Sequence, residues 1–265
     1  MRYFLSILVL LALAHPASAD IRTQVVEYKQ GDVVLEGYCA YDDSLKGQLP
    51  GVLIAHEWTG VGQYVKERAE QIAGLGYVGF AMDIYGKGIR PKDPKEASAQ
   101  AGIYRSDREL MRQRALAGLE AIKKFPFVDR SRIAAIGYCF GGGVVLELAR
   151  SGALIDGAVS FHGNLDTPHP EDARNIKGSV LVCHGADDPF VKPEQLSAFQ
   201  DEMRAARVDW QLNIYGNAVH SFTNPGSGND PASGAAYNKE ADSRSWEAMK
   251  SFLGEIFSKA KERAK

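Results

Sequence analysis

Three side chains that could together carry out acyl transfer follow one another along the chain: Cys139, Asp188 and His220. Cys139 is the centre of a Gly-x-Cys-x-Gly sequence, residues 137–141, whose glycines leave room for a sharp strand-to-helix turn that exposes the central residue. A thiolate attacks an acyl carbon, a histidine takes the thiol proton and later activates water, and a carboxylate fixes the imidazole tautomer. The three residues therefore follow in the order nucleophile, acid, histidine. The pentapeptide alone would suit a buried cysteine beside a tight turn equally well, so other residues must decide.

Acyl transfer also requires donors for the oxyanion that forms on the carbonyl oxygen. We expect two backbone N–H groups to serve, that of Phe140, directly after the nucleophile, and that of Trp58, which follows an apolar run. The loss of one such donor typically costs on the order of a hundredfold in rate.

The elements that must position these residues are a sheet and its helices. Apolar runs typical of strands buried on both faces occur at residues 51–55, 77–82, 133–136, 157–161 and 179–184, and alternation predicts a strand at 210–214. Helical composition or periodicity falls between them, at residues 65–72, 111–122, 141–150, 193–206 and 246–256. Residues 23–28 and 33–41, separated by Gly31-Asp32, predict a hairpin. The sequence therefore predicts an α/β fold, a mostly parallel, doubly wound sheet with an N-terminal antiparallel hairpin.

Polar residues follow several of these strands at their carboxyl ends, where ligands bind in such sheets. They are His56-Glu57-Trp58, Asp83-Ile84-Tyr85, Cys139, His162-Gly163 and residues 184–188, with His220 in the loop after the last strand. No histidine belongs to a short-spaced pair such as His-x-x-x-His, so we expect rim residues rather than a metal site, and no cofactor. Long loops are expected at residues 83–95, 162–175 and 216–236.

Residues 1–19 are typical of a secretory signal peptide. Arg2 precedes a short apolar run, and the segment ends in Pro16-Ala17-Ser18-Ala19. We expect cleavage near Ala19 and a periplasmic or secreted protein with one domain, residues 20–265, not attached to a membrane. An uncleaved membrane anchor is the alternative.

Charge and cysteine content narrow the function further. The net charge is −2 with both signs interspersed, which favours neither nucleic acid nor an acidic membrane surface as partner. Of the three cysteines, Cys39 and Cys183 lie in predicted strands and suit buried apolar positions, although a disulfide between them stays open. Because the count is odd, Cys139 would then still be a free thiol.

The chain resembles the dienelactone hydrolase family over most of residues 20–265. The matching stretches are residues 50–58, Asp83-Ile84-Tyr85-Gly86, Gly137-Tyr138-Cys139-Phe140-Gly141-Gly142, residues 184–191 and His220-Ser221-Phe222. The resemblance implies a single α/β-hydrolase domain and a Cys139–His220–Asp188 triad, in which the Asp-x-Phe-Val pattern selects Asp188 over Asp187. It also places Glu57 beside the thiol. Because a buried carboxylate repels a thiolate, we expect the resting thiol to stay protonated until substrate disturbs that contact.

The substrate side departs from the family pattern. The characterised dienelactone hydrolases hold a substrate carboxylate with two arginines, at positions that Lys87 and Asn224 occupy in this chain. Lys87 can still pair with an anion, but a bidentate arginine clamp is missing. Candidate walls of an acyl pocket are Trp58, Tyr85, Phe140, Phe161 and Phe222, with His162 as a further substrate contact. Ordinary core or rim packing is the competing interpretation for each.

The expected function is an exported, cofactor-independent hydrolase of small-molecule carboxylic esters or lactones, acting through a thioester on Cys139 as a monomer or small homo-oligomer. One alternative is a non-catalytic ligand-binding protein on the same fold. Another is a thiol redox protein using Cys139, against which the lack of a Cys-x-x-Cys pair argues. The sequence leaves open whether residues 83–105 cover the site as a lid.

Overall fold

One sheet of eight strands runs through the protein, whose computed structural model describes residues 20–263. The strands are β1 (Ile21–Gln30), β2 (Val33–Asp42), β3 (Leu49–Ala55), β4 (Val78–Met82), β5 (Val128–Tyr138), β6 (Gly157–Phe161), β7 (Ser179–Gly185) and β8 (Trp210–Tyr215). Their order in the sheet is β1-β2-β4-β3-β5-β6-β7-β8. The hairpin β1–β2 pairs antiparallel with β4, and every later pairing is parallel. The predicted α/β fold with its N-terminal hairpin is confirmed.

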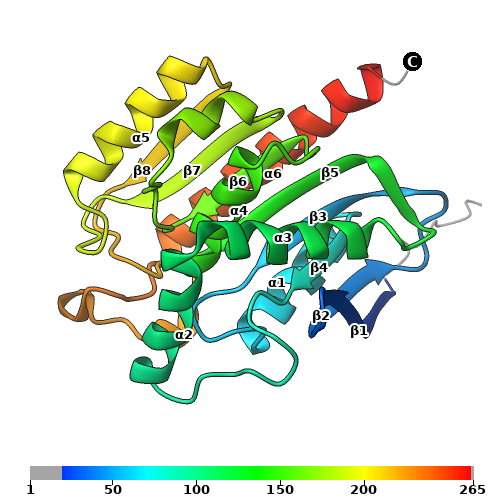
Figure 1. The fold of residues 1–265 in the computed structure, drawn as a ribbon, viewed down its shortest axis with the longest axis horizontal. Coiled ribbons are helices and arrows are strands. Elements are labelled where there is room, and N and C mark those ends of the chain that lie inside the picture. Colours follow the sequence, from blue (N-terminus) through cyan, green and yellow to red (C-terminus); the bar gives the residue numbers. More distant parts are fainter. Residues whose placement is uncertain (1–19, 264–265) are drawn as a thin grey trace, which may run out of the picture.

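Helices cover both faces of this sheet (Figure 1). They are α1 (Gln63–Gly74), α2 (Pro94–Ser106), α3 (Arg108–Ile122), α4 (Phe140–Arg150), α5 (Pro193–Ala206) and α6 (Lys239–Arg263), with short 3-10 helices η1 (Pro170–Asn175), η2 (Pro225–Ser227) and η3 (Pro231–Ser233). Apolar residues of α2, α3 and α4 pack in one cluster with the sheet, and those of α1 and α6 pack in another. Because strand side chains alternate, Leu53 of β3 joins the first cluster while Val52 and Ile54 join the second.

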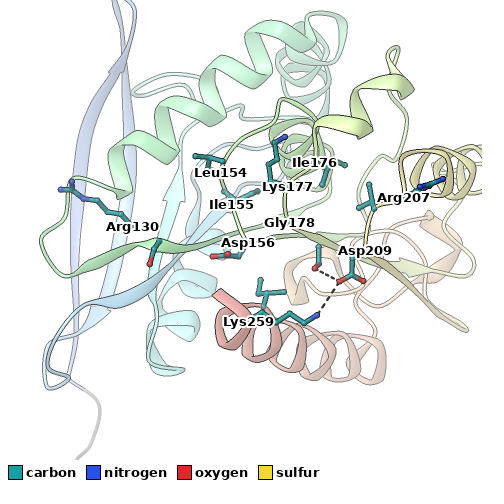
Figure 2. Close-up of a pocket in the computed structure, with 14 residues that line it drawn as sticks. Arg130, Leu154, Ile155, Asp156, Ile176, Lys177, Gly178, Arg207, Asp209 and Lys259 are labelled. Carbon is teal, nitrogen blue, oxygen red and sulfur yellow. Dashed lines mark hydrogen bonds and ion pairs between the residues drawn. The ribbon is translucent and has the colours of Figure 1, made fainter. Parts of the chain in front are cut away.

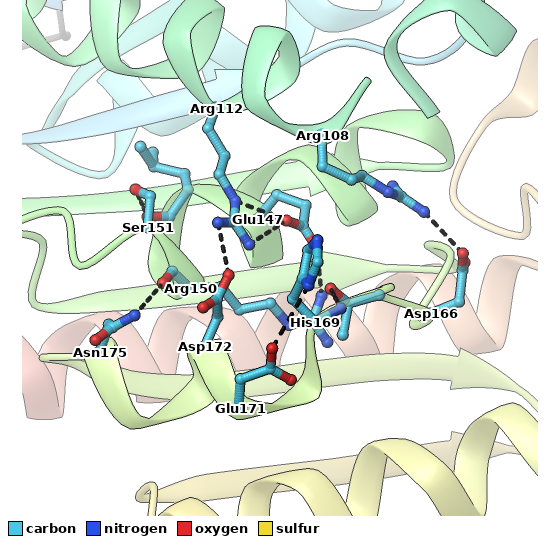
Figure 3. A network of polar contacts seen from close by, with 12 residues as sticks. Arg108, Arg112, Glu147, Arg150, Ser151, Asp166, His169, Glu171, Asp172 and Asn175 are labelled. Carbon is cyan, nitrogen blue, oxygen red and sulfur yellow. Dashed lines mark hydrogen bonds and ion pairs between the residues drawn. The ribbon is translucent and has the colours of Figure 1, made fainter. Parts of the chain in front are cut away.

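Buried ion pairs fix α4, the helix that begins directly after Cys139 (Figure 3). The fully buried carboxylate of Glu147 accepts hydrogen bonds from Arg112 Nε at 2.9 Å and Arg150 Nη1 at 3.0 Å. Arg150 also donates to both carboxylate oxygens of Glu202 on α5, at 2.7 and 2.8 Å. These bonds tie the second half of α4 to α3 on one side and to α5 on the other.

One helix was not predicted. Residues 83–95 were expected to form a loop, but α2 begins at Pro94 within that range. Asp93 caps it, because its carboxylate accepts a hydrogen bond from the Glu96 N–H at 2.8 Å. The buried positions of α2 include Ala97 and Ala101, whose small side chains give a weak helical pattern. The predicted loop at 162–175 likewise ends in the short helix η1.

The three cysteines are free thiols and all are buried. Cys39 packs in the cluster on the α3 face of the sheet, whereas Cys183 packs in the cluster on the α6 face. Four strands separate β2 from β7 in the sheet. The disulfide that the sequence left open between Cys39 and Cys183 is therefore not formed.

The predicted signal peptide, residues 1–19, lies outside the described residues. Between residues 20 and 263, no helix combines the length and the apolar character needed to cross a bilayer.

Candidate active site

Cys139 occupies a strained turn between β5 and α4. Its backbone has φ 54° and ψ −119°, in the region that favours glycine. The two flanking glycines have no room for a side chain, because a Cβ on Gly137 would stand 2.0 Å from the Gly141 carbonyl oxygen. A Cβ on Gly141 would likewise stand 2.2 Å from the Ala55 carbonyl oxygen. The backbone approach expected from the Gly-x-Cys-x-Gly sequence is therefore present.

The structure brings Cys139, His220 and Asp188 together at the carboxyl ends of the strands. His220 Nε2 lies 3.0 Å from Cys139 Sγ, and His220 Nδ1 lies 2.8 Å from Asp188 Oδ2. The Asp188 side chain is fully buried, and its other oxygen accepts the Phe190 N–H at 2.9 Å. The neighbouring Asp187 is exposed. This arrangement can pass a proton from the thiol to the imidazole while the carboxylate orients the ring.

His220 is held in an electrostatic setting that favours its charged form. Burial alone would lower the pKa of His220, but the Cys139 sulfur and the Asp188 carboxylate outweigh burial and raise this pKa to about 10. The backbone is fixed as well, since the His220 N–H donates to the Gly234 carbonyl and the His220 carbonyl accepts the Ala236 N–H. The raised pKa of His220 therefore depends on both neighbours of its ring, the sulfur at Nε2 and the carboxylate at Nδ1.

Both predicted oxyanion donors belong to backbone that other groups hold in place. Phe140 is the first residue of α4, where helical N–H groups lack intrahelical acceptors. The Trp58 N–H belongs to the peptide whose carbonyl, on Glu57, accepts the Gly60 N–H at 3.2 Å, and the Trp58 carbonyl accepts the Tyr85 hydroxyl at 2.9 Å. Within residues 20–263, neither the Phe140 nor the Trp58 N–H has a hydrogen-bond acceptor.

Glu57 lies at the same rim, and Asn224 is bonded to it. The Asn224 side-chain amide donates to Glu57 Oε2 at 2.7 Å. Burial raises the pKa of Glu57, while Asn224 and the charge of His220 oppose that rise. Among the described residues the hydrogen-bond partner of the Cys139 sulfur is His220 rather than Glu57. Repulsion between Glu57 and the thiolate stays a prediction.

Two predicted substrate contacts need correction. The His162 and Phe222 side chains are fully buried, which removes them from any surface that a substrate could touch. His162 Nδ1 instead accepts the Cys139 N–H at 3.1 Å, so the Nε2 proton is directed to Thr223 Oγ1 at 2.7 Å. Burial lowers the pKa of His162 well below its usual value, in keeping with this neutral form. His162 supports the elbow from below.

Lys87 also lies elsewhere than predicted. It forms an exposed ion pair with Glu27 of β1, and its N–H donates to the Val34 carbonyl of β2 at 2.9 Å. It therefore belongs to the surface of the hairpin rather than to the site. Tyr85 is buried and acts on the site through its bond to Trp58, while Trp58 itself remains partly exposed.

Two cavities differ in their relation to this rim. One of about 520 Å³ is lined by Glu57, Trp58, Tyr64, Ser221, Asn224 and neighbours, which include the residue after His220. Another of about 580 Å³ lies at the amino ends of β6 and β7, lined by residues that include Asp156, Lys177, Arg207 and Asp209 (Figure 2). Only the first of these two is lined by Glu57 and Trp58 of the predicted site. Residues 20–263 contain no group of three or more His, Cys, Asp or Glu residues arranged to hold a metal ion.

The family model of the dienelactone hydrolase family matches residues 35–257. The chain belongs to this family. A solved structure named m3DLH is 41% identical, covers 89% of this chain and 99% of its own, and superposes with a TM-score of 0.87. A metagenomic dienelactone hydrolase-like promiscuous phosphotriesterase is 42% identical, covers 91% and 100%, and gives a TM-score of 0.85. A Saccharolobus solfataricus protein named as a carboxymethylenebutenolidase is 27% identical over 77% of this chain and 89% of its own length.

Family membership makes the protein a lactone or ester hydrolase. The chain nevertheless differs from the characterised members of the family at the positions that hold a substrate carboxylate. At the two positions where the characterised members have arginines, this chain has Asn224, bonded to Glu57, and Lys87, bonded to Glu27 on the hairpin. Neither residue is free to clamp a substrate carboxylate. Sequence reasoning missed Thr223, which supports His162, and Phe190, whose ring lies 5.2 Å from that of His220.

Proposed function

We propose that this protein is an exported, cofactor-independent hydrolase of carboxylic esters or lactones that forms a thioester on Cys139. The observation that carries the proposal is the pair of contacts to His220, 3.0 Å from the sulfur and 2.8 Å from the Asp188 carboxylate. A non-catalytic binding protein would need neither contact at the same rim. The export part rests on the sequence of residues 1–19 alone.

The proposed reaction has two halves. In the first, the thiol proton of Cys139 passes to His220 Nε2 as Sγ attacks the acyl carbon, and the oxyanion accepts hydrogen bonds from the Phe140 and Trp58 N–H groups. The bond from carbon to the leaving oxygen breaks, that oxygen takes the proton from His220 Nε2, and the acyl group remains on sulfur. In the second half, His220 Nε2 takes a proton from water as the water oxygen attacks the thioester. The C–S bond then breaks, the carboxylic acid leaves, and the proton on His220 Nε2 returns to the Cys139 sulfur.

The direct test uses a small activated ester, phenyl acetate, and the purified protein. We expect turnover in the native protein, loss of turnover in Cys139→Ala and His220→Ala, and a mass increase of one acetyl group on Cys139 when the reaction is quenched early. A Cys39→Ala variant is the matched control, because Cys39 is also buried but lies on β2. Unchanged turnover in both active-site variants would show that another group performs the hydrolysis.

Two further parts of the proposal have their own measurements. N-terminal sequencing of the protein recovered from the producing cells should begin at Asp20, whereas a sequence beginning at Met1 would favour the uncleaved anchor. Light scattering of the purified protein should give the mass of a monomer or a small homo-oligomer. The thiol redox alternative predicts a Cys139 disulfide or sulfenate that cycles with a reductant.

A second activity, on phosphotriesters, is proposed from the metagenomic relative alone, whose title describes it as a promiscuous phosphotriesterase. An aryl phosphotriester assayed beside phenyl acetate tests it. If the same site acts on both, Cys139→Ala loses both activities together.

A further inference from the structure

Arg68 is a buried arginine of α1 whose guanidinium is bonded at every nitrogen. Within its own helix, Nε donates to the Tyr64 hydroxyl at 3.1 Å and Nη1 donates to Gln71 Oε1 at 3.0 Å. Nη2 donates to Asp242 Oδ1 of α6 and to the Thr223 carbonyl, each at 2.7 Å. The Asp242 carboxylate balances the charge, so the bond to Thr223 is the one that reaches beyond the two helices.

The Thr223 hydroxyl continues this chain of bonds toward the nucleophile. The residue is fully buried, and its Oγ1 lies 2.6 Å from the Tyr64 hydroxyl and 2.7 Å from His162 Nε2. His162 Nδ1 in turn accepts the Cys139 N–H at 3.1 Å. Both ends of the chain have a fixed direction, because an arginine can only donate and His162 Nδ1 must accept from a backbone N–H. Arg68 is thereby connected to the backbone of the elbow.

The Thr223 backbone links the same arginine to the base of the proposed triad. Thr223 stands three residues after His220, in a turn that closes when the Asn224 N–H donates to the Ser221 carbonyl at 3.0 Å. Ser221 has φ 56°, so the chain is strained directly after His220 and needs surroundings that fix it. Arg68 Nη2 holds the Thr223 carbonyl of this turn. Displacing Thr223 would therefore disturb the elbow and the base together.

We propose that Arg68 is a positioning residue, which acts through Thr223 to hold the Cys139 sulfur and the His220 imidazole at reacting distance. This inference rests on the proposed acyl transfer. The sulfur and His220 Nε2 are 3.0 Å apart, although they belong to an elbow and a turn that are 81 residues apart in sequence. The proton must cross that distance in each turnover, and a misplacement of about 1 Å can cost about a hundredfold in rate. Thr223 is bonded toward both partners, and Arg68 fixes Thr223.

The first experiment removes the Thr223 hydroxyl while keeping the branched shape of the side chain. Thr223→Val loses the bonds to Tyr64 and His162, whereas Thr223→Ser keeps a hydroxyl for them. With phenyl acetate we expect kcat to fall about ten- to a hundredfold in Thr223→Val, and KM to change by less than about threefold, because the hydroxyl contacts protein groups rather than substrate. Thr223→Ser should restore kcat to within about threefold of the native value.

The second experiment tests the arginine itself. An ammonium is a point charge and cannot reproduce the fork that reaches Tyr64 and Thr223 together, so Arg68→Lys should also lower kcat. The double variant Arg68→Lys with Thr223→Val should lose less than the product of the two single losses, because both changes act along one path. Ile72→Val is the matched control, since Ile72 is a buried apolar residue of the same helix. It should lower the urea midpoint and keep native kcat.

Two outcomes would overturn the inference. A lowered urea midpoint with native kcat in Thr223→Val would make these bonds a support of the fold and nothing more. An equal loss of kcat in Thr223→Ser and Thr223→Val would show that the hydroxyl is not what positions the site. Failure of the proposed function is distinguishable from both, because hydrolysis would then survive in Cys139→Ala.

Discussion

Replacing Asp188 by asparagine removes a charge from the proposed triad while keeping the shape of the side chain. The native carboxylate accepts two hydrogen bonds, from the Phe190 N–H at 2.9 Å and from His220 Nδ1 at 2.8 Å. An asparagine can keep the first bond only if its oxygen faces Phe190, and its amide N–H groups then face His220 Nδ1. That nitrogen must become an acceptor, so the ring proton moves to Nε2.

The consequence for catalysis arises at Nε2 of the His220 ring. His220 Nε2 lies 3.0 Å from Cys139 Sγ, and a protonated Nε2 on a neutral ring cannot take the thiol proton. The imidazolium also loses the carboxylate that helps to raise its pKa. Mispositioned tautomers of this kind cost about 10³- to 10⁴-fold in kcat, which corresponds to roughly 4 to 5.5 kcal/mol of transition-state stabilisation.

The assay is the steady-state hydrolysis of phenyl acetate by Asp188→Asn, with Asp187→Asn as the matched control. Asp187 is adjacent in sequence but exposed, so its variant should keep native kcat/KM. Urea unfolding of both variants verifies that the fold survives. If Asp188→Asn kept more than about a tenth of native kcat, the tautomer argument would be wrong. A large loss in Asp187→Asn instead would assign the acid to the other residue.

Three other predictions concern stability. Glu147→Gln should lower the free energy of unfolding by at most the roughly 3 to 5 kcal/mol that breaking a buried ion pair costs, because Arg150 keeps Glu202 and Arg112 keeps Asp172 as partners. The exposed Glu247→Gln should change it by less than about 1 kcal/mol. Urea midpoints measure both. The pKa of His220 is raised to about 10 in the folded protein. Its contribution to stability is therefore complete below about pH 6.5 and is lost as the pH rises toward 10. The unfolding free energies of the native protein and of His220→Gln should converge between pH 6.5 and pH 10. Gly137→Ala should destabilise the fold by roughly 3 kcal/mol or more, because its Cβ would meet a backbone atom at 2.0 Å. Gly102→Ala in α2 should be neutral or slightly stabilising, because nothing lies within 4 Å of a Cβ there. Thermal unfolding distinguishes the two variants.

The sheet and the elbow could be predicted because their signals are local and strong. Buried parallel strands appear as unbroken apolar runs, and the helices between them have large apolar residues at helical spacing. The helix α2 escaped prediction because Ala97 and Ala101 give little contrast with a loop. A usable signal was nevertheless present, since Asp93, Pro94 and Glu96 form a helix start with a cap, a proline at the first position and a glutamate at the third.

Side-chain direction at the rim could not be read from the sequence. His162 follows a strand, as a ligand-binding residue would, but its backbone has φ 39° and its side chain is buried beneath the elbow. Lys87 shares a loop with Tyr85, yet the loop turns back to β2 and takes Lys87 to the hairpin. Phe190 stands two residues after Asp188, and its relation to His220 depends on the contact between two loops that are distant in sequence.

The strain at Cys139 and the buried ions of α4 are connected. A non-glycine residue at φ 54° costs on the order of 1 to 3 kcal/mol and persists only when its surroundings fix it. On the strand side, the Cys139 N–H donates to the Phe161 carbonyl at 3.0 Å and to His162 Nδ1 at 3.1 Å. On the helix side, Glu147 lies two turns along α4 and holds that helix to α3. Relaxation of the turn would have to move α4, and moving α4 would separate buried charges. Cys139 can therefore keep its unfavourable backbone conformation, with its sulfur facing His220.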